Sequence, residues 1–568
     1  MLNGRLYRNA WLVAGIALVV AFLTLAPIQE PPPSDIVTVF DAASAASLTG
    51  ELEAVADTRA SGSPGAVAAA AWVQRRFREL AGGDRRTGVQ RMAVRAGGQD
   101  VPLTNVFFAV PATAETRSRR VILVVAPRDT PPGVASGASA TGVLVELARF
   151  ATTVRYHHPL LFLSTDGSVL GNAGARWFLH SASRPAIAGA IVLDAPADAT
   201  GTRVHLWEDG GSRQALGMRV PAEREVRLAG GQPSPVPGLG RQLLRLAAPE
   251  TRGDQAPFIA AGVPAITLAN RAEGPLAPAP RPTPERLDLV GNAAQGLLGS
   301  VDAVERPPAP DTGLAFAGKT LRPAVARLAL LLLTLPLLVM ALDAGTRLRR
   351  ARVRLAPGMA GVAWRFAAPM AALFVAHLLS MYGVIPAPVL GRPPLPGDVG
   401  FDSLAGLSVV LVALVSVGVW ALTRRRALAA SSSAAAEATA ALIWISLLAL
   451  IAWWWTPFAL VFILPAGHAA LGATVVRRKW QVWLLAAIAV VAPLALVGIV
   501  SGAIDRNPLT AVWYLIETSA SGARGWVGPT LATLVGVAVW CLAAPAVRRG
   551  GKTLPAPRRR RAARAPVV

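Results

Sequence analysis

Hydrophobic residues follow three different patterns along the 568-residue chain. Residues 10–27 form one apolar run that follows Arg5 and Arg8. From residue 35 to about residue 310, short apolar strands alternate with amphipathic helices. From residue 321 onward, long apolar runs are separated by short loops. The pattern predicts a hydrophobic N-terminal segment, a water-soluble domain and a membrane domain.

The soluble domain, expected at residues 35–305, has the periodicity of an α/β fold. Strands are predicted at residues 106–110, 121–126, 160–164, 187–193 and 265–268, and helices at 66–80, 141–150 and 171–180. This alternation favours a three-layer α/β sandwich, a mostly parallel or mixed sheet with helices on both faces. A domain of this size buries a full core without disulfides, and the chain has one cysteine, Cys541.

Seven apolar runs between residues 320 and 547 are each close to the length at which a helix crosses the hydrocarbon core. They are residues 323–342, 361–382, 404–422, 434–454, 456–475, 482–501 and 527–547. Residues 1–30 are interpreted as an uncleaved signal anchor, which gives an all-α bundle of eight spans. A cleaved signal peptide is the alternative.

Basic residues are concentrated in every second loop of the membrane domain. The loops after the first, third and fifth C-terminal spans are rich in arginine, and the loops between them carry few positive charges. The positive-inside rule predicts a multi-pass protein of the cell membrane with both termini cytoplasmic and residues 35–305 outside. The basic tail, residues 548–568, is expected to contact anionic inner-leaflet lipid. Since the net charge of +23 is concentrated beside the spans, nucleic acid is not an expected partner.

Few ionisable residues fall within the spans. Asp343 and Glu437 lie near span ends and are expected to be solvated. His377 and His468 lie deeper and are candidates for the transport alternative, in which the spans form a permease and the external domain is its receptor. The three tryptophans at 453–455 are typical of an interfacial aromatic belt, and a ligand-binding cage is the alternative.

Six stretches of the soluble domain resemble motifs of the zinc-dependent aminopeptidases of metallopeptidase family twenty-eight, in clan MH, and occur in that family's order. They are RASGSPG at 59–65, NVFFAVP at 105–111, LFLSTDG at 161–167, LGNAGARWF at 170–178, IVLD at 191–194, and DQAPF at 254–258 with AGVPAITL at 261–268. The resemblance covers about half of the chain and implies the aminopeptidase-like fold. An anchor, a peptidase-like domain and a multi-span region in this order are similar to the membrane members of that family.

The resemblance implies a two-zinc site, but most of the ligand positions carry other residues. The family uses two histidines, a bridging aspartate, a glutamate and a second aspartate, beside a glutamate that is the general base. These positions correspond, in chain order, to Pro127, Ser136, Ser168 (base), Val169, Asp194 and Pro282. Only the second aspartate, Asp194, is retained.

Proline and valine side chains offer no donor atom, a hydroxyl is too weak a base, and one carboxylate does not hold two zinc ions. We therefore expect a pseudoenzyme without a metal, another cofactor or a catalytic residue. Such a domain is expected to bind a peptide or a protein partner. The composition, rich in alanine, arginine, glycine and proline, is typical of a GC-rich bacterial genome.

Two alternatives keep catalysis in the soluble domain. In the first, the protein is an active zinc-dependent aminopeptidase whose ligands are displaced from the matched positions. In the second, a new acidic site is formed by Asp129, Asp166, Asp194 and Asp254. Asp129 and Asp166 are instead interpreted as loop carboxylates that cap backbone amides. The pair at residues 157 and 158 is interpreted as two histidines at a strand edge and not as relocated ligands.

Overall fold

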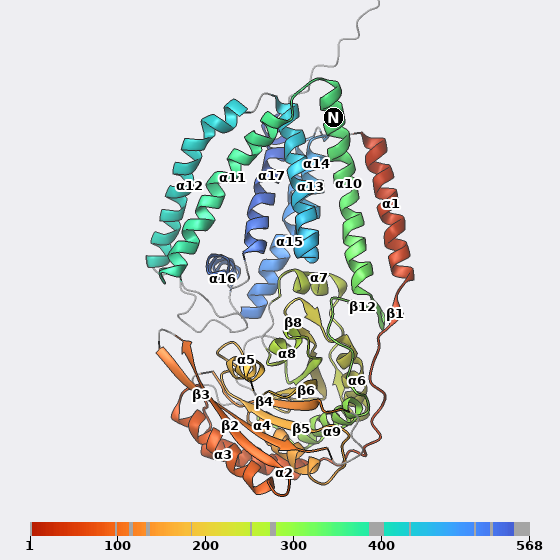
Figure 1. Cartoon of the computed structure of the whole chain (residues 1–568), viewed down its shortest axis with the longest axis vertical. Coiled ribbons are helices and arrows are strands. Elements are labelled where there is room, and N and C mark those ends of the chain that lie inside the picture. The colour runs from red at the N-terminus through yellow and green to blue at the C-terminus, as the bar shows by residue number, and fades with distance from the viewer. Residues whose placement is uncertain are drawn as a thin grey trace, which may run out of the picture.

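In the computed structural model, an α/β domain lies below a bundle of long helices (Figure 1). The structure describes residues 3–549 except for the segments 97–98, 113–117, 132–136, 183, 250–252, 273–279, 386–402, 431–432, 477, 505–506 and 523–525.

The α/β domain is built on a mixed eight-stranded sheet with the order β10-β7-β11-β6-β4-β5-β3-β2. Four adjacent strands run parallel at its centre. They are β4 (Val121–Pro127), β5 (Leu160–Thr165), β6 (Ile187–Asp194) and β11 (Ala265–Ala269). All residues of β4 and β5 are buried, because helices cover both faces of these strands.

Helices complete the three-layer sandwich on either side of the sheet (Figure 1). On the face turned away from the bundle lie α2 (Ala42–Val55), α3 (Pro64–Leu80), α4 (Ala138–Ala151) and α9 (Pro284–Asp302). On the face toward the bundle lie α5 (Ala173–His180) and α8 (Gln255–Ala260). The predicted three-layer α/β architecture is confirmed.

The outer strands of the sheet are longer or more numerous than the apolar runs indicate. They are β2 (Arg86–Ala96), β3 (Gln99–Val110), β7 (Arg203–Trp207) and β10 (Gln232–Pro233). The sequence pattern misses β2 because its side chains are mostly half-buried or exposed, and charged residues are common on edge strands.

Six helices are long and apolar enough to cross a membrane. They are α1 (Gly4–Leu23), α10 (Pro323–Arg350), α11 (Ala356–Met381), α12 (Ser403–Ala430), α13 (Ala434–Trp455) and α15 (Lys479–Ile504). The two remaining predicted spans correspond to apolar helices whose described side chains cover Pro457–Ala473 and Val527–Ala543. One is a 3₁₀ turn, η1 (Pro457–Ala459), that continues into α14 (Leu460–Ala473), and the other is α17 (Val527–Arg549).

One helix occurs where the sequence predicts a loop. α16 (Pro508–Ala520) begins with a proline after Asn507, whose side chain accepts a hydrogen bond from the Thr510 amide at 2.9 Å. Both features are strong helix-start signals. At 13 residues, α16 is too short to cross a bilayer, so a search for long apolar runs does not find it.

The two acids predicted to be solvated near span ends are both ion-paired. Glu437 of α13 pairs with Arg365 of α11, and Asp343 pairs with Arg347 one turn along α10 at 3.0 Å. Both carboxylates are half-buried, so their solvation stays a prediction, and α10 continues to Arg350, eight residues past the predicted end. A position near the end of an apolar run is therefore still inside a helix, where residues four apart are neighbours.

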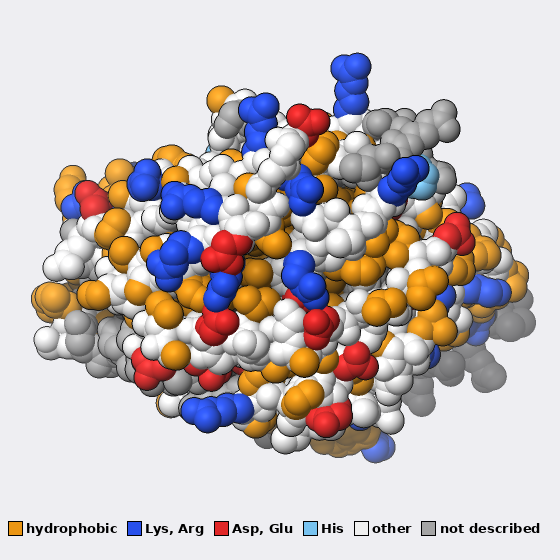
Figure 2. Space-filling view, turned by 90° about the horizontal axis from the view of Figure 1, so that it is seen from below, with side chains coloured by type: hydrophobic (Ala, Val, Ile, Leu, Met, Phe, Trp, Pro, Cys, Tyr) orange, Lys and Arg blue, Asp and Glu red, His pale blue; other side chains and the backbone are white. Residues whose placement is uncertain are grey.

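A small sheet joins the α/β domain to the bundle. β1 (Ala26–Pro27), which follows α1, pairs with β13 (Lys319–Leu321), which precedes α10, and β13 also pairs with β12 (Leu314–Phe316). Beside it, α7 (Leu239–Ala247) lies under the bundle and shares an apolar cluster with it (Figure 1). The opposite face of the α/β domain intermixes acidic, basic and apolar side chains (Figure 2).

Candidate functional site at the carboxyl edge of the sheet

The loops that follow β4, β5, β6 and β11 meet at one edge, because the carboxyl ends of parallel strands lie side by side. Pro127 is the last residue of β4, Asp194 is the last residue of β6, and Asp166 directly follows β5. Ser136 lies outside the described residues. Pro282 is half-buried, two residues before α9 begins.

Asp129, in the loop after β4, is bound by the backbone of the loop after β5. Its carboxylate accepts hydrogen bonds from the amides of Ser168 and Val169, each at 3.0 Å, and from the Ser61 hydroxyl at 3.0 Å. Ser168 and Val169 therefore contribute their N–H groups here, and Asp129 caps them as predicted. Burial, together with the negative charge of the neighbouring Asp166, raises the pKa of Asp129 to about 6.

Asp166 is paired with the guanidinium of Arg128, whose side chain is fully buried. The two groups are 3.0 Å apart, and Arg128 also donates to the backbone oxygens of Ser164 and Thr104. Asp166 accepts from the amides of Thr104 and Gly167 as well. The contacts with Arg128 and Thr104 join the loop after β5 to the loop after β4 and to strand β3, so Asp166 holds these three segments together.

Asp194, the one retained ligand position, is paired with a guanidinium. Arg271 lies 3.2 Å from it, follows β11 by two residues and stacks over the Trp207 ring at 5.8 Å. In the sheet, Ala269 is directly opposite Asp194, and this register brings Arg271 to the carboxylate. The sequence analysis does not single out Arg271, although its place just past a central strand was an available signal.

Asp254 and Asp198 are also buried at this edge. The Asp254 side chain accepts a hydrogen bond from Thr165 Oγ1 at 2.5 Å, and its other oxygen has no partner among the described residues. Burial, together with the negative charges of Asp129 and Asp194, raises the pKa of Asp254 to about 7. Asp198 accepts from the Gly137 amide at 2.6 Å, and burial raises its pKa to about 6.

This donor set does not fit the two-zinc centre that the resemblance implies. Zinc sites use three or four nitrogen, sulfur or carboxylate donors arranged around one point. Within the described part of the chain, no three histidine, cysteine or acidic residues have such an arrangement. The carboxylates at the edge bond instead to amides, hydroxyls and guanidinium groups.

The two histidines considered as relocated ligands hold a strand to a helix. Asp302, the last residue of α9, accepts hydrogen bonds from the backbone amides and the Nδ1 atoms of both His157 and His158. The second ring nitrogen of His158 contacts the Glu305 carbonyl at 3.2 Å. Burial opposes the charge of Asp302, but the four hydrogen bonds outweigh it and lower its pKa. The pair is therefore structural, as predicted.

The two histidines in the bundle make contacts between helices. His468 of α14 bonds to the Tyr7 hydroxyl of α1 at 3.0 Å and to the Leu333 carbonyl of α10 at 3.4 Å. His377 of α11 bonds to the Ala520 carbonyl at the end of α16 at 3.1 Å and packs edge-on against Trp526. In both cases a ring nitrogen satisfies a polar group of another helix.

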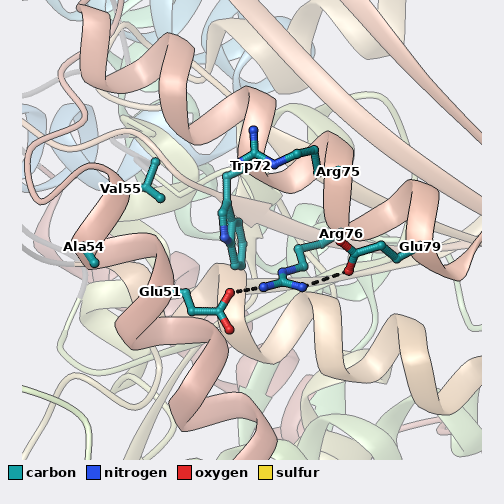
Figure 3. A pocket seen from close by; sticks show the side chains of 7 residues that line it. All are labelled: Glu51, Ala54, Val55, Trp72, Arg75, Arg76 and Glu79. Carbon is teal, nitrogen blue, oxygen red and sulfur yellow. Dashed lines mark hydrogen bonds and ion pairs between the residues drawn. The ribbon is translucent and has the colours of Figure 1, made fainter.

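A surface cavity of about 370 Å³ lies away from this edge, between α2 and α3 (Figure 3). Figure 3 shows Arg76 between Glu51 and Glu79, to both of which it is ion-paired, and the guanidinium lies 5.6 Å from the Trp72 ring. The charges of this cavity thus balance one another, and its position separates it from the strand ends.

No protein-family model matches the chain, and no curated protein sequence matches it. Several solved structures match the chain. A glutaminyl cyclase of Fimbriiglobus ruber is 18% identical, with a TM-score of 0.36 over 47% of this chain and 98% of the cyclase. A leucine aminopeptidase precursor of Bacteroides thetaiotaomicron is 15% identical, with a TM-score of 0.37 over 48% and 99%. An aminopeptidase of Aneurinibacillus sp. strain AM-1 is 13% identical, with a TM-score of 0.37 over 47% and 95%.

These structures are of the aminopeptidase and glutaminyl cyclase kind. Membership of family twenty-eight itself stays a prediction. At these identities the likeness concerns the fold alone.

Proposed function

We propose that the chain is a membrane-anchored, peptidase-like binding protein whose α/β domain neither holds zinc nor catalyses hydrolysis. One observation carries the proposal: the retained ligand position, Asp194, is paired with Arg271 at 3.2 Å. A guanidinium is a fixed positive charge, so it supplies the counter-charge that a metal ion would supply and repels a metal ion from the same place. The amide-bound carboxylate of Asp129 supports the same conclusion.

The same edge is the proposed place for a peptide or protein partner. Its loops carry hydroxyl and amide groups and a half-buried Asp194–Arg271 pair, and polar groups of this kind can bind a peptide backbone without reacting with it. Transport is less well supported, since both bundle histidines are used in contacts between helices.

We further propose that the α/β domain is extracytoplasmic and that both termini face the cytoplasm. The arginine-rich ends of α10 and α12 support this orientation, because both lie at the end of the bundle opposite the α/β domain (Figure 1). The partner of the domain is then a molecule outside the cell membrane.

Metal content tests the loss of the zinc centre. The full chain, purified in detergent, is expected to contain well under one zinc per molecule after dialysis against micromolar zinc. It is also expected to leave aminoacyl-nitroanilides uncleaved. Two tightly bound zinc ions, with hydrolysis that a chelator abolishes, would establish the alternative of an active enzyme with a displaced site.

Cysteine labelling tests the orientation. Cys541 is buried, so two matched substitutions at exposed helix ends, Ala81→Cys after α3 and Ala351→Cys after α10, report on opposite sides. A membrane-impermeant maleimide is expected to label Ala81→Cys in intact cells and Ala351→Cys only after lysis. Labelling in the reverse order would overturn the orientation and leave the metal result unaffected.

A further inference from the structure

A second cavity, of about 330 Å³, lies where the α/β domain meets the bundle. The α/β domain contributes the hairpin of β8 (Asp209–Gly210) and β9 (Arg213–Gln214), together with the ends of α7 and α8. The bundle contributes the first turns of α10 and the residues that join α13 to η1. Figure 1 shows α7 and β8 directly under the bundle. Cavities of about 300–1,000 Å³ are typical of small-molecule sites.

Two arginines line this cavity, and neither has a carboxylate partner within the described parts of the chain. They are Arg213 in β9 and Arg327 in the second turn of α10. The guanidinium of Arg327 lies 5.7 Å over the Trp453 ring, and Trp453 Nε1 donates to the Arg327 carbonyl at 2.9 Å. Stacking fixes a guanidinium while its N–H donors stay available to an oxyanion.

The acids closest in sequence to the lining residues are already engaged. Asp209 is paired with Arg245 at 2.7 Å, and Asp311 accepts a hydrogen bond from the Gly313 amide at 2.7 Å. None of the described residues that line the cavity is acidic, so the two arginines give the lining an excess of positive charge.

The rest of the lining is apolar and aromatic. Trp454 and Trp455 end α13 with 68% and 65% of their surface exposed, beside Leu246 of α7 and Phe458 of η1. Exposed tryptophans at the end of an apolar helix are typical of the boundary between hydrocarbon and head groups. The cavity thus joins an anion-binding part to a part suited to hydrocarbon.

The β8–β9 hairpin is constrained to present Arg213 at this position. A side chain at Gly210 would come within 2.6 Å of the Ala256 carbonyl of α8, so only glycine allows the hairpin to lie against that helix. Gly211 has a φ of +59°, as the first turn residue of a tight two-residue hairpin requires. Arg213 follows the turn directly.

We propose that this cavity binds the head group of a phospholipid with a net negative charge. Arg213 and Arg327 donate to the phosphate oxygens, and the glycerol and the first acyl carbons lie against Trp454 and Trp455. A zwitterionic head group carries an ammonium group beside its phosphate, and the two arginines repel that ammonium. Charge complementarity therefore favours a head group with a net negative charge. The inference goes beyond the proposed function and uses the proposed orientation only to say which leaflet supplies the lipid.

Short-chain lipids in detergent solution test the site without a membrane. Dihexanoyl phosphatidylglycerol is titrated into the full chain by isothermal calorimetry, beside dihexanoyl phosphatidylcholine, glycerol 3-phosphate and inorganic phosphate. The phosphatidylglycerol is expected to bind at least about tenfold more tightly than the other three. The double variant Arg213→Gln/Arg327→Gln is expected to weaken it by about tenfold or more, the loss of one or two charged hydrogen bonds.

The double variant Arg349→Gln/Arg350→Gln is the matched control, since it removes two charges from the other end of α10 and is expected to bind like the unchanged chain. Circular dichroism and size exclusion verify that both variants are folded. Equal binding of phosphatidylcholine, equal binding of glycerol 3-phosphate, or unchanged binding by Arg213→Gln/Arg327→Gln would each overturn the proposal. A failed orientation test with intact phosphatidylglycerol binding would reassign the leaflet alone.

Discussion

The carboxyl edge of the sheet and the junction under the bundle both contain arginines, but the partners of these arginines differ. At the edge, Arg128 and Arg271 are bound to Asp166 and Asp194. At the junction, Arg213 and Arg327 have no such partner among the described residues. At the carboxyl edge, where α/β folds usually place their active sites, the charged groups are occupied by ion pairs within the protein. The arginines that are available to a ligand lie at the junction.

The difference follows from burial. A buried charge without a partner is strongly unfavourable, so the edge retains its carboxylates only because guanidinium groups and amides neutralise them. At the exposed junction the same charges are solvated and need no internal partner. Substitutions should therefore have large effects on stability at the edge and effects on binding at the junction.

The largest effect is expected from Arg128→Met. It leaves the Asp166 carboxylate buried without its partner, which costs about 3–5 kcal/mol. The midpoint of thermal unfolding of the detergent-solubilised chain should fall sharply, with little folded protein recovered. Arg76→Met, in the partly exposed cluster of Figure 3, is the matched control and should cost about 0–1 kcal/mol. Equal losses from the two variants would remove the contrast between buried and exposed pairs.

A smaller loss is expected from Asp302→Asn. The native carboxylate accepts hydrogen bonds from the amides of His157 and His158, whereas the NH₂ group of an asparagine side chain is itself a donor and cannot accept them. The lost contacts are expected to cost about 2 kcal/mol. Thermal unfolding measures it, with Asp288→Asn on the exposed side of α9 as the control, for which a change below about 0.5 kcal/mol is expected. An Asp302→Asn variant whose thermal unfolding is unchanged would contradict a structural role for the histidine pair.

The buried acids of the edge predict a pH dependence opposite to that of ordinary salt-bridged carboxylates. Asp254, Asp129 and Asp198 have pKa values of about 7, 6 and 6 in the fold, against about 3.9 in the unfolded chain. Between pH 4 and 7 the native state therefore binds more protons, and the free energy of unfolding falls as the pH rises from 5 to 8.

Thermal unfolding between pH 5 and 8 checks this dependence, and each kcal/mol should appear as about 2–4 °C. Asp254→Asn should flatten the slope. His205 acts in the opposite direction, because burial lowers its pKa and its protonation at low pH favours unfolding. A midpoint that rises steadily from pH 5 to 8 would show that the acids are not buried as described.

The smallest effect on stability is expected from Arg271→Gln, about 1 kcal/mol, because the pair with Asp194 is partly exposed. The informative measurement is zinc content. It should stay well under one per chain, since a single freed carboxylate does not complete a zinc site. Recovery of zinc binding by Arg271→Gln would mean that the arginine alone blocks an otherwise competent centre.

The apolar elements of the fold are predictable from the sequence because burial on both faces leaves one readable signal. The central strands β4, β5 and β6 belong to this class. The six long helices are predictable for another reason, because they are apolar over the length that a membrane span needs. The edge strand β2 is not predictable in this way, because most of its side chains are half-buried or exposed. The helix α16 is missed because it has only 13 residues.

At the candidate site the sequence identifies residue types, but not their partners. Asp129 as an amide cap could be predicted, because loop aspartates commonly take this role. Its donors, Ser168 and Val169, could not, since they come from another loop. The pairing of Arg271 with Asp194 depends on the register of β11 against β6, which a single sequence does not encode as a local pattern.

The short pairing of β1 with β13 has a consequence for how the chain is assembled. Ala26 lies opposite Thr320, and α1 packs along α10. The chain therefore leaves the bundle for the α/β domain and returns to it at the same point. In topological terms the α/β domain is inserted between the first two long helices of the bundle, α1 and α10. A short turn from Pro27 to Lys319 would join these two helices directly, and the helical part should then assemble as an independent unit.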